Sequence, residues 1–185
     1  LTVAAGGELT VKDGDSAGGG ALTTDGESTL QVSGGTLTLE SGSILNTRGD
    51  GNRGGTAITT SYPSGGTVNI HGGTVRSEND FGVQINGAGT LKITGGSITG
   101  RTGGIFNQTK DSKNVTISGG VITLSAAKPG QGQYAVNNCT IRGGTLRAKD
   151  RDCIAGDVST ELPPPGAEKD REGYYVCTVG GSGTP

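Results

Sequence analysis

Residues 68–75 read VNIHGGTV, in which apolar and polar residues alternate up to a Gly pair and continue after it. Gly pairs in copies of this phrase begin at positions 34, 72, 95, 119 and 143, and the last three steps are 23, 24 and 24 residues. A near-constant period of this size, with the same pattern in each copy, indicates a repeat architecture. The other copies lie at 30–37 (LQVSGGTL), 91–98 (LKITGGSI), 115–122 (VTISGGVI) and 139–146 (CTIRGGTL), with a looser one at 1–9 (LTVAAGGEL).

Each phrase predicts two short strands joined by a corner. Alternation places Val68, Ile70 and Val75 on one side, and two consecutive glycines permit a tight corner with positive φ. A small residue followed by an aliphatic one comes after each phrase, which adds a third strand to each turn. We therefore predict an all-β chain, folded as a single-stranded, right-handed parallel β-helix of about six rungs of roughly 24 residues. An antiparallel sandwich is the alternative, but it would carry Asn-Gly or Asp-Gly hairpin turns at shorter spacing.

The aligned copies predict two files of inward residues in the core. Each file takes one residue from each rung, and rungs stack about 4.8 Å apart. The first file comprises Leu30, Val68, Leu91, Val115 and Cys139, and the second comprises Val32, Ile70, Ile93, Ile117 and Ile141.

The C-terminal part of the chain has a different composition. We expect the β-helix to cover 1–158 and a Pro- and charge-rich connector to cover 159–173. The strand-like YYVCTV at 174–179 is the expected cap, because the end of a solenoid exposes unpaired backbone. Residues 180–185 (GGSGTP) are expected to be a linker. We also expect the chain to be a piece of a longer protein.

Composition excludes several classes of protein. The chain has 38 Gly, no Met and no Trp, so its core must consist of stacked aliphatic residues. The formal net charge of −2 argues against nucleic acid as a partner. No apolar run is long enough for a transmembrane helix, so membrane insertion is not expected.

Three turns are longer than the others, and their extra residues are expected on one edge of the helix, where repeat proteins often bind partners. These stretches are 12–20, 46–55 and 125–134. Their polar and aromatic residues are the candidate ligand contacts. They are Asp13, Asp15, Arg48, Asp50, Asn52, Arg53, Lys128, Gln131 and Tyr134.

Asp13, Asp15 and Asp50 are the candidate calcium ligands, because Ca²⁺ takes carboxylate and carbonyl oxygens. They lack the EF-hand spacing, and solvated turn residues are the simpler interpretation. No other cofactor is expected. A Cys153–Cys177 disulfide would attach the cap strand to the last turn in an oxidising compartment. The single histidine, His71, is expected to be a solvated strand residue, so it offers no base for a nucleophile.

The phrases GGTVNIHGGTV, GTLKITGGSI, KNVTISGGVITL and CTIRGGTLRA resemble the β-helical segments of secreted or wall-attached proteins of Gram-positive bacteria. They are also similar to a clostridial cell-surface family of calcium-bearing β-helices that bind acidic plant polysaccharides. The resemblance covers roughly residues 30–154. It implies a parallel β-helix outside the cell, with a polysaccharide or another surface glycan as ligand. The turns FGVQI, GGIFN and YAVNN depart from the Asp-Gly-Ile turns of that family.

These observations favour a non-catalytic extracellular or cell-surface module, adhesin-like or glycan-binding. Its expected partner is a polysaccharide, a host glycan or a host surface protein. Two alternatives remain open at this stage. One is a calcium-dependent polysaccharide lyase, although no inserted loop shows a dense acidic cluster. The other is a purely structural spacer.

Overall fold

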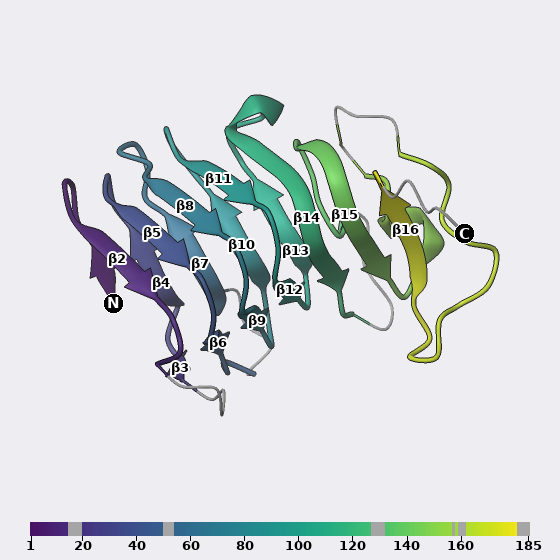
Figure 1. Cartoon of the computed structure of the whole chain (residues 1–185), viewed down its shortest axis with the longest axis horizontal. Helices are drawn as coiled ribbons and strands as arrows, with labels where there is room; N and C mark the ends of the chain where they lie inside the picture. Colours follow the sequence, from purple (N-terminus) through teal and green to yellow (C-terminus); the bar gives the residue numbers. More distant parts are fainter. Residues whose placement is uncertain (15–19, 50–53, 127–131, 157, 159–161, 181–185) are drawn as a thin grey trace.

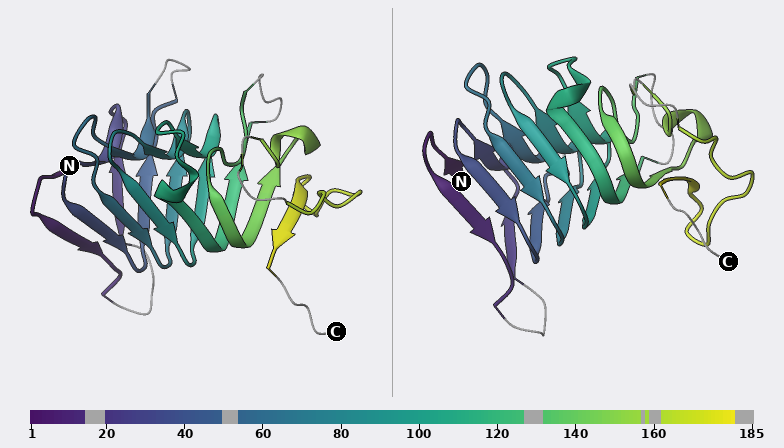
Figure 2. Two further views of the ribbon diagram at one scale, coloured as in Figure 1. Left: turned by 90° about the horizontal axis from the view of Figure 1, so that it is seen from above. Right: turned by 45° about the horizontal axis from the view of Figure 1, so that its top comes forward.

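Alternation of apolar and polar residues produces strands between Thr2 and Ala148, and these strands stack side by side as a parallel β-solenoid (Figure 1). This computed structural model describes residues 1–14, 20–49, 54–126, 132–156, 158 and 162–180. Figure 2 shows the same stack from two further directions. The predicted all-β parallel β-helix is therefore confirmed.

Each turn places one strand on each of three faces, and equivalent strands of successive turns pair in parallel. Face 1 comprises β1 (Thr2–Val3), β4 (Ser28–Val32), β7 (Thr56–Thr60), β10 (Phe81–Ile85) and β13 (Gly103–Asn107). Face 2 comprises β2 (Glu8–Val11), β5 (Thr36–Leu39), β8 (Thr67–Ile70) and β11 (Thr90–Ile93). Face 3 comprises β3 (Ala21–Thr24), β6 (Ser43–Asn46), β9 (Thr74–Ser77) and β12 (Ser97–Gly100).

Later strands run through both face 2 and face 3. These are β14 (Val115–Leu124) and β15 (Thr140–Ala148), which pair with each other in parallel. Two short 3₁₀ helices lie outside the faces, η1 (Ser112–Asn114) and η2 (Arg151–Cys153). None of the described helical segments is long and apolar enough to cross a membrane.

The turns number about five, one fewer than the six predicted. Face 1 has five strands, and each marks one turn, numbered 1 to 5 along the chain. The next turn adds to face 1 only an isolated bridge between Ile105 and Val136. The last apolar phrase therefore contributes β15 to the stack without a complete sixth turn.

Inward aliphatic residues form the core, as predicted. Ile70, Ile93 and Ile117 are fully buried and are paired in register through β8, β11 and β14. The predicted positions of Leu30 and Val32 in these files are wrong, although both residues are buried. Leu30 pairs with Ile58 on face 1, whereas the files on face 2 continue through Leu37 and Leu39.

The error has a physical cause. Turns 1 to 4 each contain two strand–Gly–strand units, one at corner 1 (between faces 1 and 2) and one at corner 2 (between faces 2 and 3). Gly34 and Gly35 lie at corner 1, because the N–H of Gly34 donates to the carbonyl of Gly65. Gly72 and Gly73 lie at corner 2, where a Cβ on Gly73 would approach the Gly42 carbonyl to 2.6 Å. The two units have the same sequence pattern. The sequence alignment therefore matched the copy at 30–37, which spans corner 1, with the copy at 68–75, which spans corner 2.

The prediction that the three inserted stretches share one edge is also wrong. Residues 12–20 connect β2 to β3 and belong to corner 2. Residues 47–55 connect β6 to β7 and belong to corner 3, between faces 3 and 1, as does the stretch that follows β14. Insertions of a few residues fit at any corner of a solenoid, because a loop there disturbs no strand pairing.

The C-terminal cap is β16 (Tyr175–Val179), which pairs antiparallel with β15 at the end of the stack. The chain before β16 is tied to β15 by Arg147. Its Nε donates to Asp170 at 3.0 Å, and its Nη2 contacts Glu172 at 2.8 Å. The ring of Tyr174 lies beneath two cations, with Lys149 Nζ 3.7 Å from its centroid. The cap covers the backbone edge that β15 would otherwise expose.

Candidate functional site

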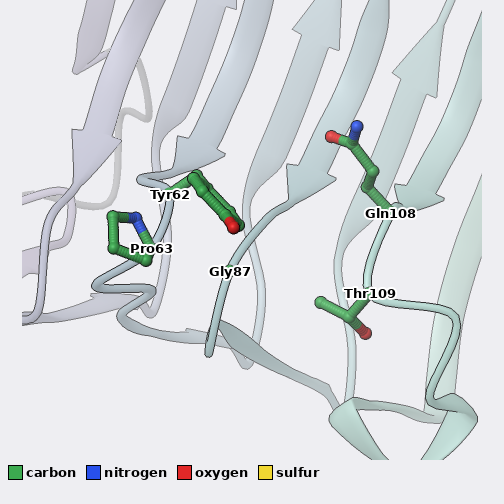
Figure 3. Close-up of a pocket in the computed structure, with 5 residues that line it drawn as sticks. All are labelled: Tyr62, Pro63, Gly87, Gln108 and Thr109. Carbon is green, nitrogen blue, oxygen red and sulfur yellow. The ribbon is translucent and has the colours of Figure 1, made fainter.

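A slot of about 630 Å³ opens at corner 1, where three successive turns leave face 1 (Figure 3). Tyr62 and Pro63 follow β7, Gly87 follows β10, and Gln108 and Thr109 follow β13. In Figure 3, Tyr62 and Pro63 lie on one side, Gln108 and Thr109 lie opposite, and Gly87 lies between them. Turns stack about 4.8 Å apart, so the two sides are separated by roughly 10 Å along the solenoid axis.

The loop that carries Tyr62 is held at its base by one backbone hydrogen bond and by the side chain of Thr60. The N–H of Gly65 donates to the carbonyl of Ser61 at 2.7 Å. At the end of β7, the hydroxyl of Thr60 donates to the carbonyl of Asn86 and accepts from its N–H, at 2.9 and 2.7 Å. The Tyr62 side chain projects from this anchored loop and is 84% exposed.

Gly87 forms the floor of the slot and has no side chain to fill it. Its φ is +58°, and a Cβ at this position would approach the Pro63 carbonyl to 2.6 Å and the Ser61 carbonyl to 2.8 Å. A larger residue would therefore strain the backbone and clash with the Tyr62 loop. The absence of a side chain leaves the space between Tyr62 and Gln108 open.

The opposite side of the slot rests on a buried amide. Asn107 is fully buried, and its Nδ2 donates to the carbonyls of Asp111 and Asn138 at 2.9 and 2.7 Å. The Thr109 hydroxyl donates to Asn107 Oδ1 at 2.7 Å, so this hydroxyl is oriented by the loop. The side-chain amide of Gln108 forms no hydrogen bond with any part of the chain that the structure describes, and the residue is exposed.

The slot thus combines an aromatic ring, an unpaired amide and a hydroxyl around a glycine floor. Such side chains bind through ring contact and through hydrogen bonds given and accepted. Apart from the tyrosine phenol, no titratable side chain of the described residues lines the slot. The lining therefore suits an uncharged ligand that carries hydroxyl groups.

Asp13, Arg48 and Tyr134 are the three predicted contact residues whose positions the structure describes. Asp15, Asp50, Asn52, Arg53, Lys128 and Gln131 lie outside the described residues. Asp13 closes the loop at corner 2. Its carboxylate accepts from the N–H of Gly20, and its own N–H donates to Ser41, both at 2.8 Å.

Arg48 and Tyr134 lie at corner 3, on different turns, so the described candidates do not form one cluster. Arg48 Nη1 would be 3.3 Å from a Cβ on Gly54. The ring of Tyr134 packs on Gly156, where a Cβ would approach it to 2.4 Å. Tyr134 therefore supports the end of the solenoid.

Calcium was predicted at Asp13, Asp15 and Asp50. Among the described residues, no group of three or more His, Cys, Asp or Glu side chains could hold a metal ion. Two of the three predicted ligands lie outside those residues. The loops containing Asp13 and Asp50 leave the solenoid at different corners, because one precedes β3 and the other precedes β7.

The predicted Cys153–Cys177 disulfide is not present, since all three cysteines are free and buried. Cys177 lies in β16 opposite Leu146, and its thiol donates to the Pro163 carbonyl at 3.0 Å. Burial raises the pKa of Cys139, Cys153 and Cys177, and nearby Asp150 and Asp152 add to the effect at Cys153. Protonated thiols are weak nucleophiles, so these cysteines have the character of core residues.

Comparisons with protein-family models, with curated proteins and with solved structures returned no match. Function is therefore inferred from the chemistry of the site, because a fold by itself does not specify one.

Sequence reasoning missed the slot because its residues are far apart in the chain. Tyr62, Gly87 and Gln108 come from turns 3, 4 and 5. The one local signal is the stretch SYPSGG at 61–66, which lengthens corner 1 and places an aromatic residue in a loop.

Proposed function

We propose that the protein is a non-catalytic module, secreted or on the cell surface, that binds a glycan in the slot at corner 1. One observation carries this proposal. The highly exposed ring of Tyr62 lies across the open slot from the side-chain amide of Gln108, which has no hydrogen-bond partner among the described residues. A sugar ring presents a C–H face to an aromatic side chain and hydroxyls to an amide, so this pair matches both of its surfaces.

The shape of the solenoid supports the same role. Binding sites are usually concave and largely preformed, and here partly buried hydrogen bonds hold both sides of the slot. A ligand would therefore bind without ordering a loop, and little conformational entropy would be lost. The resemblance of the repeats to secreted Gram-positive proteins supports a location outside the cell.

A structural spacer is the second candidate function. It is favoured by the aliphatic core, which continues from turn to turn through the described solenoid. A spacer would need this stiffness but no exposed aromatic at corner 1.

A glycan array and affinity electrophoresis with soluble polysaccharides test the proposal on the whole chain. We expect Tyr62→Ala to weaken binding roughly tenfold, and Tyr62→Phe to retain most of it because the ring remains. Asn69→Ala is the matched control, since Asn69 is an outward amide on face 2, away from corner 1. Binding should be equal in calcium and in a chelator.

A blank array would contradict glycan binding and favour the spacer. Binding that survives Tyr62→Ala unchanged would show that the slot is not the site.

A further inference from the structure

The outer surface of face 1 carries a second concave region next to the slot. A groove of about 430 Å³ crosses turns 2, 3 and 4. Gln31, Thr59 and Gln84 line it and are neighbours in register, one from each turn. Their side chains point outward, because the residues flanking them in β4, β7 and β10 are buried.

The groove offers hydrogen-bonding groups at the spacing of the strands, about 4.8 Å. Gln31 is exposed, and its side-chain amide has no hydrogen-bond partner among the described residues. An apolar ridge borders the groove, because Phe106 pairs in register with Gln84 and stacks on Phe81 with ring centroids 4.6 Å apart. Amides beside aromatic edges form a surface of the same character as the slot.

Asn86 connects the groove to the slot. Its Oδ1 accepts from Gln84 Nε2 at 3.3 Å, and its Nδ2 donates to the Thr59 hydroxyl at 3.2 Å. The next residue, Gly87, is the floor of the slot. The extended chain from Asp80, before β10, to Asn86 spans on the order of 20 Å. This length exceeds that of one sugar ring.

Two carboxylates lie where the strands of face 1 begin, at the end of the groove away from the slot. Glu27 precedes β4 and Asp80 precedes β10, and both line the groove. Arg48 lies beside Gly54 at the same end. Glu27 is exposed and forms no ion pair with any residue that the structure describes, so a ligand with its own carboxylates would be repelled at this end of the groove.

We infer that the ligand is an extended, linear polysaccharide without uronic acid groups, which occupies the groove of face 1 and the slot together. This inference rests on the proposed glycan binding at Tyr62 and adds the length and the charge of the ligand. A short saccharide fills the slot alone, and longer chains gain affinity from the groove.

Chain length tests the inference. Binding of the whole protein is measured by calorimetry with neutral glucan, xylan and mannan chains and with their disaccharides. We expect Gln31→Ala to weaken binding of the long chains roughly fivefold and to leave the disaccharides unchanged. Tyr62→Ala should weaken both. Asn69→Ala is the control, and circular dichroism confirms that each variant is folded.

The outcomes separate the two proposals. If Gln31→Ala changes no chain length while Tyr62→Ala weakens all of them, the groove is overturned and the slot stands. If Tyr62→Ala changes nothing while Gln31→Ala weakens the long chains, the slot is overturned. If no neutral chain binds, the inference of a neutral, extended ligand is overturned, and the slot proposal falls as well only if the glycan array is also blank.

Polygalacturonate tests the charge. We expect the unaltered protein to bind it at least tenfold more weakly than a neutral chain of similar length, and Glu27→Gln to narrow the difference. Equal binding of the charged and neutral chains by the unaltered protein would overturn the exclusion of uronic acids.

Discussion

Single residues of the core matter because each is one member of a continuous file. Ile93 is fully buried between Ile70 of the preceding turn and Ile117 of the following one. A polar group at this position would have no partner, because only aliphatic side chains stack above and below it. Lys92, its neighbour in β11, points outward and is exposed. The two positions therefore form a matched pair for mutation.

Ile93→Asp should remove on the order of 4 kcal/mol or more from the free energy of unfolding, because it buries an unpaired carboxylate. Stability of a domain is typically about 5–15 kcal/mol, so the variant should be largely unfolded or melt far below the original protein. Lys92→Asp should change stability by about 0.5 kcal/mol or less. Thermal denaturation followed by circular dichroism compares them, and a folded Ile93→Asp protein of normal stability would contradict the inward assignment.

Among the described elements, the cap is held to β15 by ion pairs of Arg147 with Asp170 and Glu172. Asp170 accepts from the N–H of Tyr174 at 2.9 Å and from Arg147 Nε at 3.0 Å. The N–H of Tyr174 is the main cause that lowers the pKa of Asp170, and Arg147 adds to it. The cap is therefore tied to β15 by a carboxylate that must remain ionised.

A carboxylate whose pKa is lower in the folded state stabilises that state above its unfolded pKa, which is about 3.9. The contribution is lost as the pH falls below that value and through the folded pKa. We expect the urea midpoint of the unaltered protein to decline as the pH falls through this acidic range. The urea midpoint of Asp170→Asn should decline less steeply over the same range. Parallel urea titrations at a series of pH values measure the difference. The same slope in both proteins would show that Asp170 does not link the cap to pH.

For the whole molecule, the cap determines whether the solenoid remains a single stack. β15 pairs with β14 on one side and with β16 on the other. Without β16, the outer edge of β15 would present unpaired N–H and C=O groups in a row, and such edges pair with other chains.

Deletion of residues 162–185 should therefore produce dimers or larger assemblies that the full chain does not form at the same concentration. Size-exclusion chromatography with light scattering measures the mass. The first turn is identical in both proteins, so a difference reports on the β15 edge. A monomeric truncated chain would show that this edge is protected in another way.

Much of the fold could be predicted because its information is local. Alternation in VNIHGGTV and its copies identifies the inward residues Val68, Ile70 and Val75, which are all buried. The assignment of Leu30 to face 2 failed because corner 1 and corner 2 have the same strand–Gly–strand pattern. Only the pairing of Leu37 with Val68 shows which unit belongs to which face.

The candidate site could not be predicted in the same way. The expected contact residues were chosen from the longest loops, but Asp13 closes its own loop and Tyr134 packs on Gly156. Arg48 is the only described member of that set near the groove of face 1. Loop length in sequence shows where the chain leaves the solenoid, but not which turns stand next to one another at that corner.

The sequence by itself determined that this protein is a parallel β-helix with an aliphatic core, because strand alternation and glycine corners act over a few residues. Only the tertiary structure decided the register of the early turns and the location of the slot. Tyr62, Gly87 and Gln108 come together because parallel stacking brings residues from successive turns into adjacent rows. The proximity of these three residues depends on the length of every corner between them in the chain, so it is a property of the folded solenoid.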